Sequence, residues 1–268
     1  MPALAPMLSA GRRPLWLDYG DYAGALLAGG KLPWLDVAAY VALQRKAQGL
    51  LRSDVVQLPV ADVCAAWVAA RPALRAEMAS KKRTLFPLKT LLADAGLRTL
   101  LLELTRGLRA CFDGLPLALV CPSPGAWVVQ AWRLAQGADA PVEVSEDDTD
   151  GASVYIADFL RAFGEAGVDV LLLQEAGEGT KALDLYQPVL NVAAHYRWEA
   201  GLQSAVEIAG EGLSFVISPA SASGRDLPPG VWNGGAAPEC PAQGFRYAKI
   251  PADAQPEIVL QRLAELRT

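Results

Sequence analysis

The chain has 268 residues, of which 52% are hydrophobic, and it carries 24 Lys and Arg against 29 Asp and Glu. This composition excludes a disordered protein. The net charge of −5 and the single histidine argue against nucleic-acid binding, which needs clustered Lys and Arg. The apolar runs are far shorter than the roughly 20 residues of a membrane-spanning helix, and no cationic leader precedes the first one. We therefore expect a cytoplasmic protein without nucleic-acid or membrane partners.

The cysteines and the histidine indicate no metal site. Cys64, Cys111, Cys121 and Cys240 are widely spaced and form no C-x-x-C pair, so neither structural zinc nor a disulfide framework is predicted. His195 lies within a predicted helix, and the absence of a G-x-S-x-G motif excludes a hydrolase elbow. The sequence therefore predicts reduced thiols and no cofactor.

Strand-like runs alternate with longer helical segments, which is typical of proteins with a parallel sheet. Strands are predicted at residues 14–19, 54–60, 115–121, 168–173, 213–217, 230–232 and 246–250. Helices are predicted at residues 35–51, 63–70, 74–78, 85–92, 97–112, 152–166, 182–209 with a break near Gly201, and 256–266, and another passes through Trp127 and Trp132. The acid-rich residues 137–151 are predicted to be a surface excursion, and residues 177–181 (GEGTK) to be a loop.

No linker divides this series, so residues 1–268 are predicted to form one domain. Units of one strand and one helix, repeating about every 30 to 45 residues, favour a TIM-type (β/α) barrel. An open doubly wound sheet stays as the alternative. Since the pattern yields only seven strands, we expect an α/β barrel shortened by about one βα unit, with the eighth strand either missing or supplied differently. In either fold the site lies at the carboxyl ends of the strands.

Residues 158–171 (DFLRAFGEAGVDVL), followed by LLQEAGEG and then Tyr186 and Pro188, resemble the uroporphyrinogen decarboxylase family. In that family a D-Y-L-x-x-Q helix leads into a strand ending F-D-S-W-A-G. Residues 54–63, 115–132 and 246–266 resemble further family segments in the same order. The resemblance implies a TIM-type barrel with a deep cleft at the strand carboxyl ends. It also implies an activity related to uroporphyrinogen decarboxylase, to corrinoid-linked methyltransferases or to cobalamin-independent methionine synthase.

The sequence departs from this family at the residues that carry its chemistry. Asp18, Tyr19 and Asp21 stand where the family's R-Q-A-G-R motif supplies cations, so a polycarboxylate porphyrinogen is repelled and a haem-pathway decarboxylase is not expected. The His-x-Cys zinc pair of the methyltransferase branch is absent, and Ser218 stands at the corresponding strand end. A zinc site built from Cys121, Glu175 and Cys240 is the alternative that the spacing does not favour.

The resemblance places the family's catalytic aspartate at Asp62 when one extra residue is allowed, and its tyrosine at Phe159. Asp62 and Glu175 are the candidate catalytic acid/base groups. Asp62 as a helix N-cap, Glu175 as a loop carboxylate and Cys121 as a buried hydrophobe are the structural alternatives. The candidate substrate-binding residues are Asp18, Tyr19, Cys121, Ser123, Gln174, Ser218 and Asn233.

The sequence thus predicts a uroporphyrinogen decarboxylase-like enzyme, a lyase or a methyltransferase component, that acts on a small organic substrate. Its partner would be a second copy of the chain or a corrinoid protein. The alternative is a non-catalytic ligand-binding or partner subunit that retains the barrel.

Overall fold

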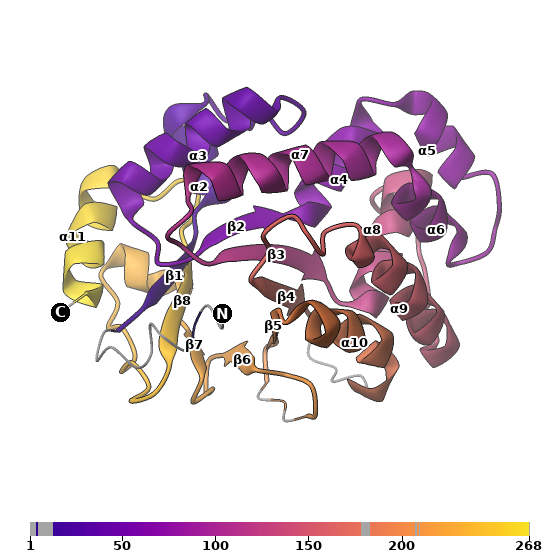
Figure 1. Cartoon of the computed structure of the whole chain (residues 1–268). Helices are drawn as coiled ribbons and strands as arrows, with labels where there is room; N and C mark the ends of the chain where they lie inside the picture. Colours follow the sequence, from indigo (N-terminus) through magenta and orange to yellow (C-terminus); the bar gives the residue numbers. More distant parts are fainter. Residues whose placement is uncertain (1–3, 5–12, 178–182, 207, 209, 268) are drawn as a thin grey trace.

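The computed structural model describes residues 4, 13–177, 183–206, 208 and 210–267. Eight parallel strands, in the order β1-β8-β7-β6-β5-β4-β3-β2, form a nearly closed barrel surrounded by helices (Figure 1). The TIM-type barrel predicted from the sequence is confirmed. The strands are β1 (Leu15–Asp18), β2 (Val56–Pro59), β3 (Leu117–Pro122), β4 (Val170–Gln174), β5 (Glu199–Gln203), β6 (Phe215–Ser218), β7 (Gly224–Asp226) and β8 (Phe245–Lys249).

Of the two alternatives for the eighth strand, its absence is wrong, because the described residues form eight strands. β5 lies where a helix over 182–209 was predicted, because α10 (Gln187–Tyr196) ends at Arg197 in a left-handed conformation. A Cβ on Gly201 in β5 would lie 2.1 Å from the ring of Phe215, so close packing of the barrel explains this glycine. The short strand β7 was not predicted, and residues 230–232 belong to the 3₁₀ helix η2 (Pro229–Asn233) instead of a strand.

The helices are distributed unevenly around the barrel. The α-helices are α2 (Gly20–Leu27), α3 (Val37–Leu51), α4 (Val60–Ala69), α5 (Pro72–Met78), α6 (Phe86–Ala93), α7 (Ala95–Cys111), α8 (Pro124–Gln136), α9 (Glu146–Arg161), α10 and α11 (Pro256–Leu266), and η1 (Leu183–Tyr186) is a 3₁₀ turn. Among the described residues between β5 and β8, η2 is the only helix of any kind. Figure 1 shows helices covering the β1–β4 side while loops join β5, β6 and β7.

The acid-rich segment before Gly151 is not wholly an excursion, because α9 begins within it at Glu146. Ser145 accepts a hydrogen bond from the backbone N–H of Asp148, and the Asp148 carboxylate accepts one from the backbone N–H of Ser145. This capping box satisfies free N–H groups of the first turn. The acids there also complement the positive end of the helix dipole.

Side chains alternate between the barrel interior and the helix layer. Leu15 and Leu17 pack outward with α11, whereas Trp16 points inward and contacts the rings of Phe215, Phe245 and Tyr247 at centroid distances of 5.8 to 6.2 Å. Leu4, Val120, Leu172 and Ile217 are buried in the same interior cluster. This filling leaves the strand carboxyl ends as the place for a cavity.

Side chains and one backbone hydrogen bond, from the N–H of Asp54 to the carbonyl of Leu15 at 2.9 Å, close the barrel between its first two strands. The described residues of β1 and β2 form no strand ladder. Instead, the backbone N–H of Leu15 donates to Asp54 Oδ2 at 2.8 Å, and that of Leu17 donates to Ser53 Oγ at 2.9 Å. Trp16 Nε1 also donates to Gln57 Oε1 at 2.7 Å. The bonds to Asp54 and Ser53 satisfy backbone N–H groups of β1 that a neighbouring strand would otherwise satisfy.

Candidate functional site: the cavity at the barrel mouth

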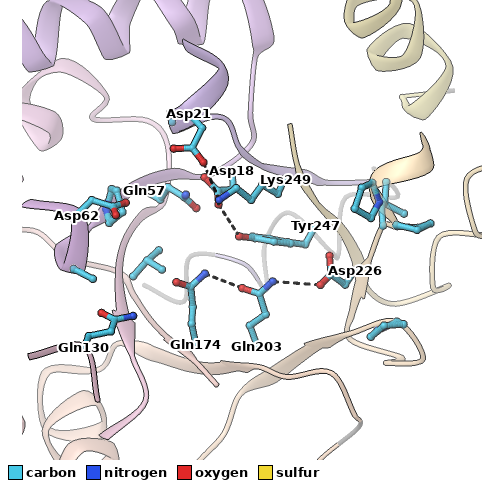
Figure 2. Close-up of a pocket in the computed structure, with 18 of the residues that line it drawn as sticks. Asp18, Asp21, Gln57, Asp62, Gln130, Gln174, Gln203, Asp226, Tyr247 and Lys249 are labelled. Carbon is cyan, nitrogen blue, oxygen red and sulfur yellow. Dashed lines mark hydrogen bonds and ion pairs between the residues drawn. The ribbon is translucent and has the colours of Figure 1, made fainter. Parts of the chain in front are cut away.

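A cavity of about 720 Å³ opens at the carboxyl ends of the strands. Since every strand is parallel, the last inward-facing residues of several strands meet there. They are Asp18 of β1, Gln174 of β4, Gln203 of β5, Asp226 of β7, and Tyr247 and Lys249 of β8 (Figure 2). Asp21, Gln57, Asp62 and Gln130 complete the polar part of the wall, and Trp34 adds an aromatic ring. We call this space the mouth cavity.

A chain of amide hydrogen bonds crosses one wall of the mouth cavity. Gln174 Nε2 donates to Gln203 Oε1 at 2.9 Å, and Gln203 Nε2 donates to Asp226 Oδ2 at 3.3 Å (Figure 2). A carboxylate only accepts, so Asp226 fixes the orientation of the Gln203 amide. Burial raises the pKa of Asp226, and the hydrogen bond from Gln203 opposes that effect.

The opposite wall holds one cation between carboxylates. Lys249 Nζ lies 2.9 Å from Asp21 Oδ2 and 4.0 Å from Asp18 Oδ2, and Tyr247 Oη donates to Asp18 Oδ2 at 3.5 Å. Burial raises the pKa of Asp18 despite the charge of Lys249. Desolvation lowers the pKa of Lys249, but the hydrogen bond to Asp21 and the charge of Asp18 outweigh it and raise the pKa overall. Lys249 is therefore a cation at neutral pH.

Asp62 reaches the mouth cavity from the first turn of α4, directly after β2. Desolvation, followed by the charges of Asp18 and Asp21, raises the pKa of Asp62 to about 6, and Lys249 opposes this rise. The N-cap of α4 is Pro59, so the N-cap alternative for Asp62 is wrong. A second cavity of about 600 Å³, which includes Arg75 and Arg133, shares Asp62 and Gln130 with the first one.

Glu175 does not line the mouth cavity. Its carboxylate accepts hydrogen bonds from Ser123 Oγ at 2.8 Å and from Tyr186 Oη at 2.5 Å. The backbone N–H of Ser123 in turn donates to the carbonyl of Gln174 at 2.8 Å. Burial is the main cause that raises the pKa of Tyr186, and the hydrogen bond to Glu175 and the charge of Glu175 raise it further. These contacts make Glu175 and Ser123 an anchor behind the wall that holds the end of β4, and with it Gln174.

Asp18, Asp62 and Gln174 are thus the predicted site residues that line the mouth cavity. Tyr19 is buried, and its hydroxyl donates to Gln48 at 3.4 Å. Cys121 is fully buried in the core, where burial raises the pKa of its thiol.

Two other predicted residues, and the predicted loop, contribute nothing to the described wall. Ser218 is fully buried, and its Oγ has no hydrogen-bond partner among the described residues. Asn233 is exposed on η2. Residues 178–181 of the predicted loop lie outside the described part of the chain.

The sequence reasoning missed several residues of the wall. Gln203 and Asp226 were missed because β5 and β7 were not predicted. Lys249 and Tyr247 lie in a strand that was predicted, and the rule that sites lie at strand carboxyl ends, with alternation along β8, could have selected both. Gln57 could be selected only once the side chains facing the barrel interior were known, and Gln130 only once the position of α8 was known.

The described residues bring together no group of three or more His, Cys, Asp or Glu side chains that could hold a metal ion. Cys121 faces the core and Cys240 lies in the segment between η2 and β8, so the alternative zinc set with Glu175 does not fit.

The fold and the site define a TIM-type barrel with an acidic cavity at the carboxyl ends of its strands. Neither the protein-family models nor the curated proteins compared with this chain contain a match to it. No helix in the described ranges is long and apolar enough to cross a membrane.

Proposed function

We propose that the protein is an enzyme that acts on a small organic substrate in the mouth cavity, with Asp62 as the group that exchanges a proton with it. The observation that carries this proposal is that Asp62, in the first turn of α4, lines the cavity together with Asp18 and Asp21, where desolvation and these two charges raise its pKa to about 6. A general acid or base is most effective when its pKa lies near the working pH. At neutral pH Asp62 is mainly a carboxylate, and it holds a proton often enough to return one.

The other side chains of the wall suit the support of such a step. Lys249, kept cationic by Asp21 and Asp18, is placed to stabilise negative charge that develops on a substrate oxygen. The amide chain from Gln174 to Asp226 is fixed by its own hydrogen bonds, so it offers a preorganised surface for orienting the substrate. Glu175 acts as a positioning residue through Ser123 and the end of β4.

Of the activities that the family resemblance implies, we propose a lyase. A lyase step needs proton transfer at the reacting atoms, which Asp62 can supply. Methyl transfer from a zinc-activated thiol needs a ligand set that the described residues do not bring together. The acids in the wall disfavour a polycarboxylate such as uroporphyrinogen.

The test is an activity search in D₂O. Pools of small hydroxy, keto and amino compounds are incubated with the full chain, and proton NMR follows both product formation and the loss of C–H signals by exchange. We expect at least one compound to react, and Asp62→Asn to slow that reaction by about 10²-fold or more. Asp150→Asn removes the same charge from an exposed position on α9 and should leave the rate unchanged.

Full turnover by Asp62→Asn would refute the assigned role. If no compound reacts but one of them raises the melting temperature of the protein, the non-catalytic binding subunit becomes the better explanation.

A further inference from the structure

The charges in the wall of the mouth cavity do not balance. Lys249 is matched by Asp21 and Asp18, which lie 2.9 and 4.0 Å from its Nζ. Asp62 and Asp226 also line the cavity, and neither takes part in an ion pair among the described residues. Figure 2 shows these two carboxylates on opposite sides of the view. The wall therefore carries two carboxylates that no cation of the described residues pairs with.

Asp226 is the better placed of the two to bind a cation. It is half-buried at the end of β7, and its hydrogen-bond partner is the neutral amide of Gln203. An amide offsets only part of the cost of desolvating a carboxylate, whereas a cation in contact offsets much more of it. Asp62 is more exposed, and as the proposed acid/base group it must be free to gain and lose a proton.

Gln57 supplies a second and independent observation. It is 9% exposed and lines the cavity, and its Oε1 accepts the hydrogen bond from Trp16 Nε1. That bond leaves Nε2 as the free end of the amide, and no described residue accepts a hydrogen bond from it. Nε2 is not among the fully buried polar atoms of the described residues that lack a partner, so it is accessible from the cavity. The side chain of Gln57 is therefore free to donate to an oxygen atom of a ligand.

From these two observations we propose that the mouth cavity binds a substrate that carries a protonated amine, which contacts Asp226, and an oxygen acceptor, which contacts Gln57. The chemical class is that of a small amino alcohol or amino carbonyl compound. That this ligand is a substrate rests on the proposed function. The preference for a protonated amine does not rest on it, because Asp226 has no part in the proton transfer.

The experiment compares probes that share a four-carbon chain and a hydroxyl group and differ in charge at the other end: aminobutanol, butanediol and hydroxybutyrate. Each is titrated into the full chain, and NMR chemical shifts give the dissociation constants. We expect aminobutanol to bind at least about tenfold more tightly than butanediol, which corresponds to about 1.4 kcal/mol, and hydroxybutyrate to bind most weakly. Butylamine, which lacks the oxygen, should bind more weakly than aminobutanol.

Two variants test whether Asp226 causes the preference for aminobutanol. Asp226→Asn keeps the shape of the side chain and an acceptor for Gln203, so it should fold, and it should reduce the advantage of aminobutanol over butanediol to about twofold or less. Asp150→Asn should retain the advantage. Thermal unfolding checks that both variants are folded.

The proposal would be overturned if aminobutanol bound no more tightly than butanediol. It would also be overturned if aminobutanol kept its tighter binding in Asp226→Asn. Equal binding of butylamine and aminobutanol would remove the role of Gln57. None of these results bears on Asp62, whose role is judged from turnover by Asp62→Asn, so a failure of this inference is distinguishable from a failure of the proposed function.

Discussion

The pKa of Asp62 gives the sharpest test of the site, because two substitutions should move it in opposite directions. Asp18→Asn removes the largest charge effect that raises it, so the pKa of Asp62 should fall below about 6. Lys249→Met removes the cation that lowers it, so the pKa should rise further. Asp150→Asn, which lies on α9, should have no effect.

The consequence for reactivity is large. At pH 7 a carboxyl group with a pKa of about 6 is protonated in about one molecule in ten, whereas one at the ordinary value of 3.8 is protonated in fewer than about one in a thousand. The supply of protonated Asp62 therefore differs by roughly a hundredfold between these two cases. The part of the pKa shift that comes from the charges of Asp18 and Asp21 should weaken in high salt, since Asp62 keeps contact with solvent.

The assay is a titration of side-chain carboxyl carbons by NMR in the parent protein and the three variants, with Asp62 assigned from the spectrum of Asp62→Asn. A parent midpoint close to 3.8 would refute the reasoning. So would shifts of the same sign in Asp18→Asn and Lys249→Met, because the two substitutions remove charges of opposite sign.

The same shift has a consequence for stability. The folded protein holds the Asp62 proton more tightly than the unfolded chain does, so this group stabilises the fold below about pH 4 and that contribution is lost as the pH rises through about 6. In urea unfolding at several pH values, Asp62→Asn should therefore make the stability less dependent on pH over this window. An unchanged pH dependence would contradict the assignment.

Three further predictions concern the barrel. Ser53→Ala leaves the buried N–H of Leu17 without its acceptor and should lower the free energy of unfolding by about 1 to 3 kcal/mol in urea, whereas Ser80→Ala at an exposed site should change it by less than about 0.5 kcal/mol. Leu172→Ala, in the filled interior, should cost about 3 to 5 kcal/mol by the same measurement, and a loss below about 1 kcal/mol would contradict the packing. Arg197→Gly should raise the melting temperature, because Arg197 ends α10 at φ 60°, where glycine avoids steric strain; an unchanged or lower value would argue against that geometry.

The parts of the fold that could be predicted are those whose local pattern agrees with their final structure. β4 is a run of buried apolar residues, and α7 has apolar residues at helical spacing, so both were predicted close to their observed bounds. β5 was not predicted, because Glu199–Gln203 contains few strand-forming residues and its glycine suggests a helix break. Its conformation depends on hydrogen bonds to β4 and β6, which lie far away in sequence.

The site divides in the same way. Asp18, Asp62 and Gln174 follow or end strands that were predicted, so the rule of strand carboxyl ends selected them correctly as residues of the cavity wall. The same rule selected Glu175, which is the next residue after Gln174 and therefore points to the other side of the strand. A difference of one residue decides between the cavity and the outer wall, and only the register of the barrel fixes it.

By itself, the sequence determined the class of the fold and placed acids at the strand ends, because these depend on composition and on local periodicity. Only the tertiary structure decided that the barrel has eight strands, that Asp54 and Ser53 help to close it, and that Asp226 and Lys249 share a cavity with Asp62. These features require residues distant in sequence to meet. The physical reason is that strand pairing and burial are non-local: they set the charge balance and the raised pKa of Asp62 through neighbours that no local pattern reveals.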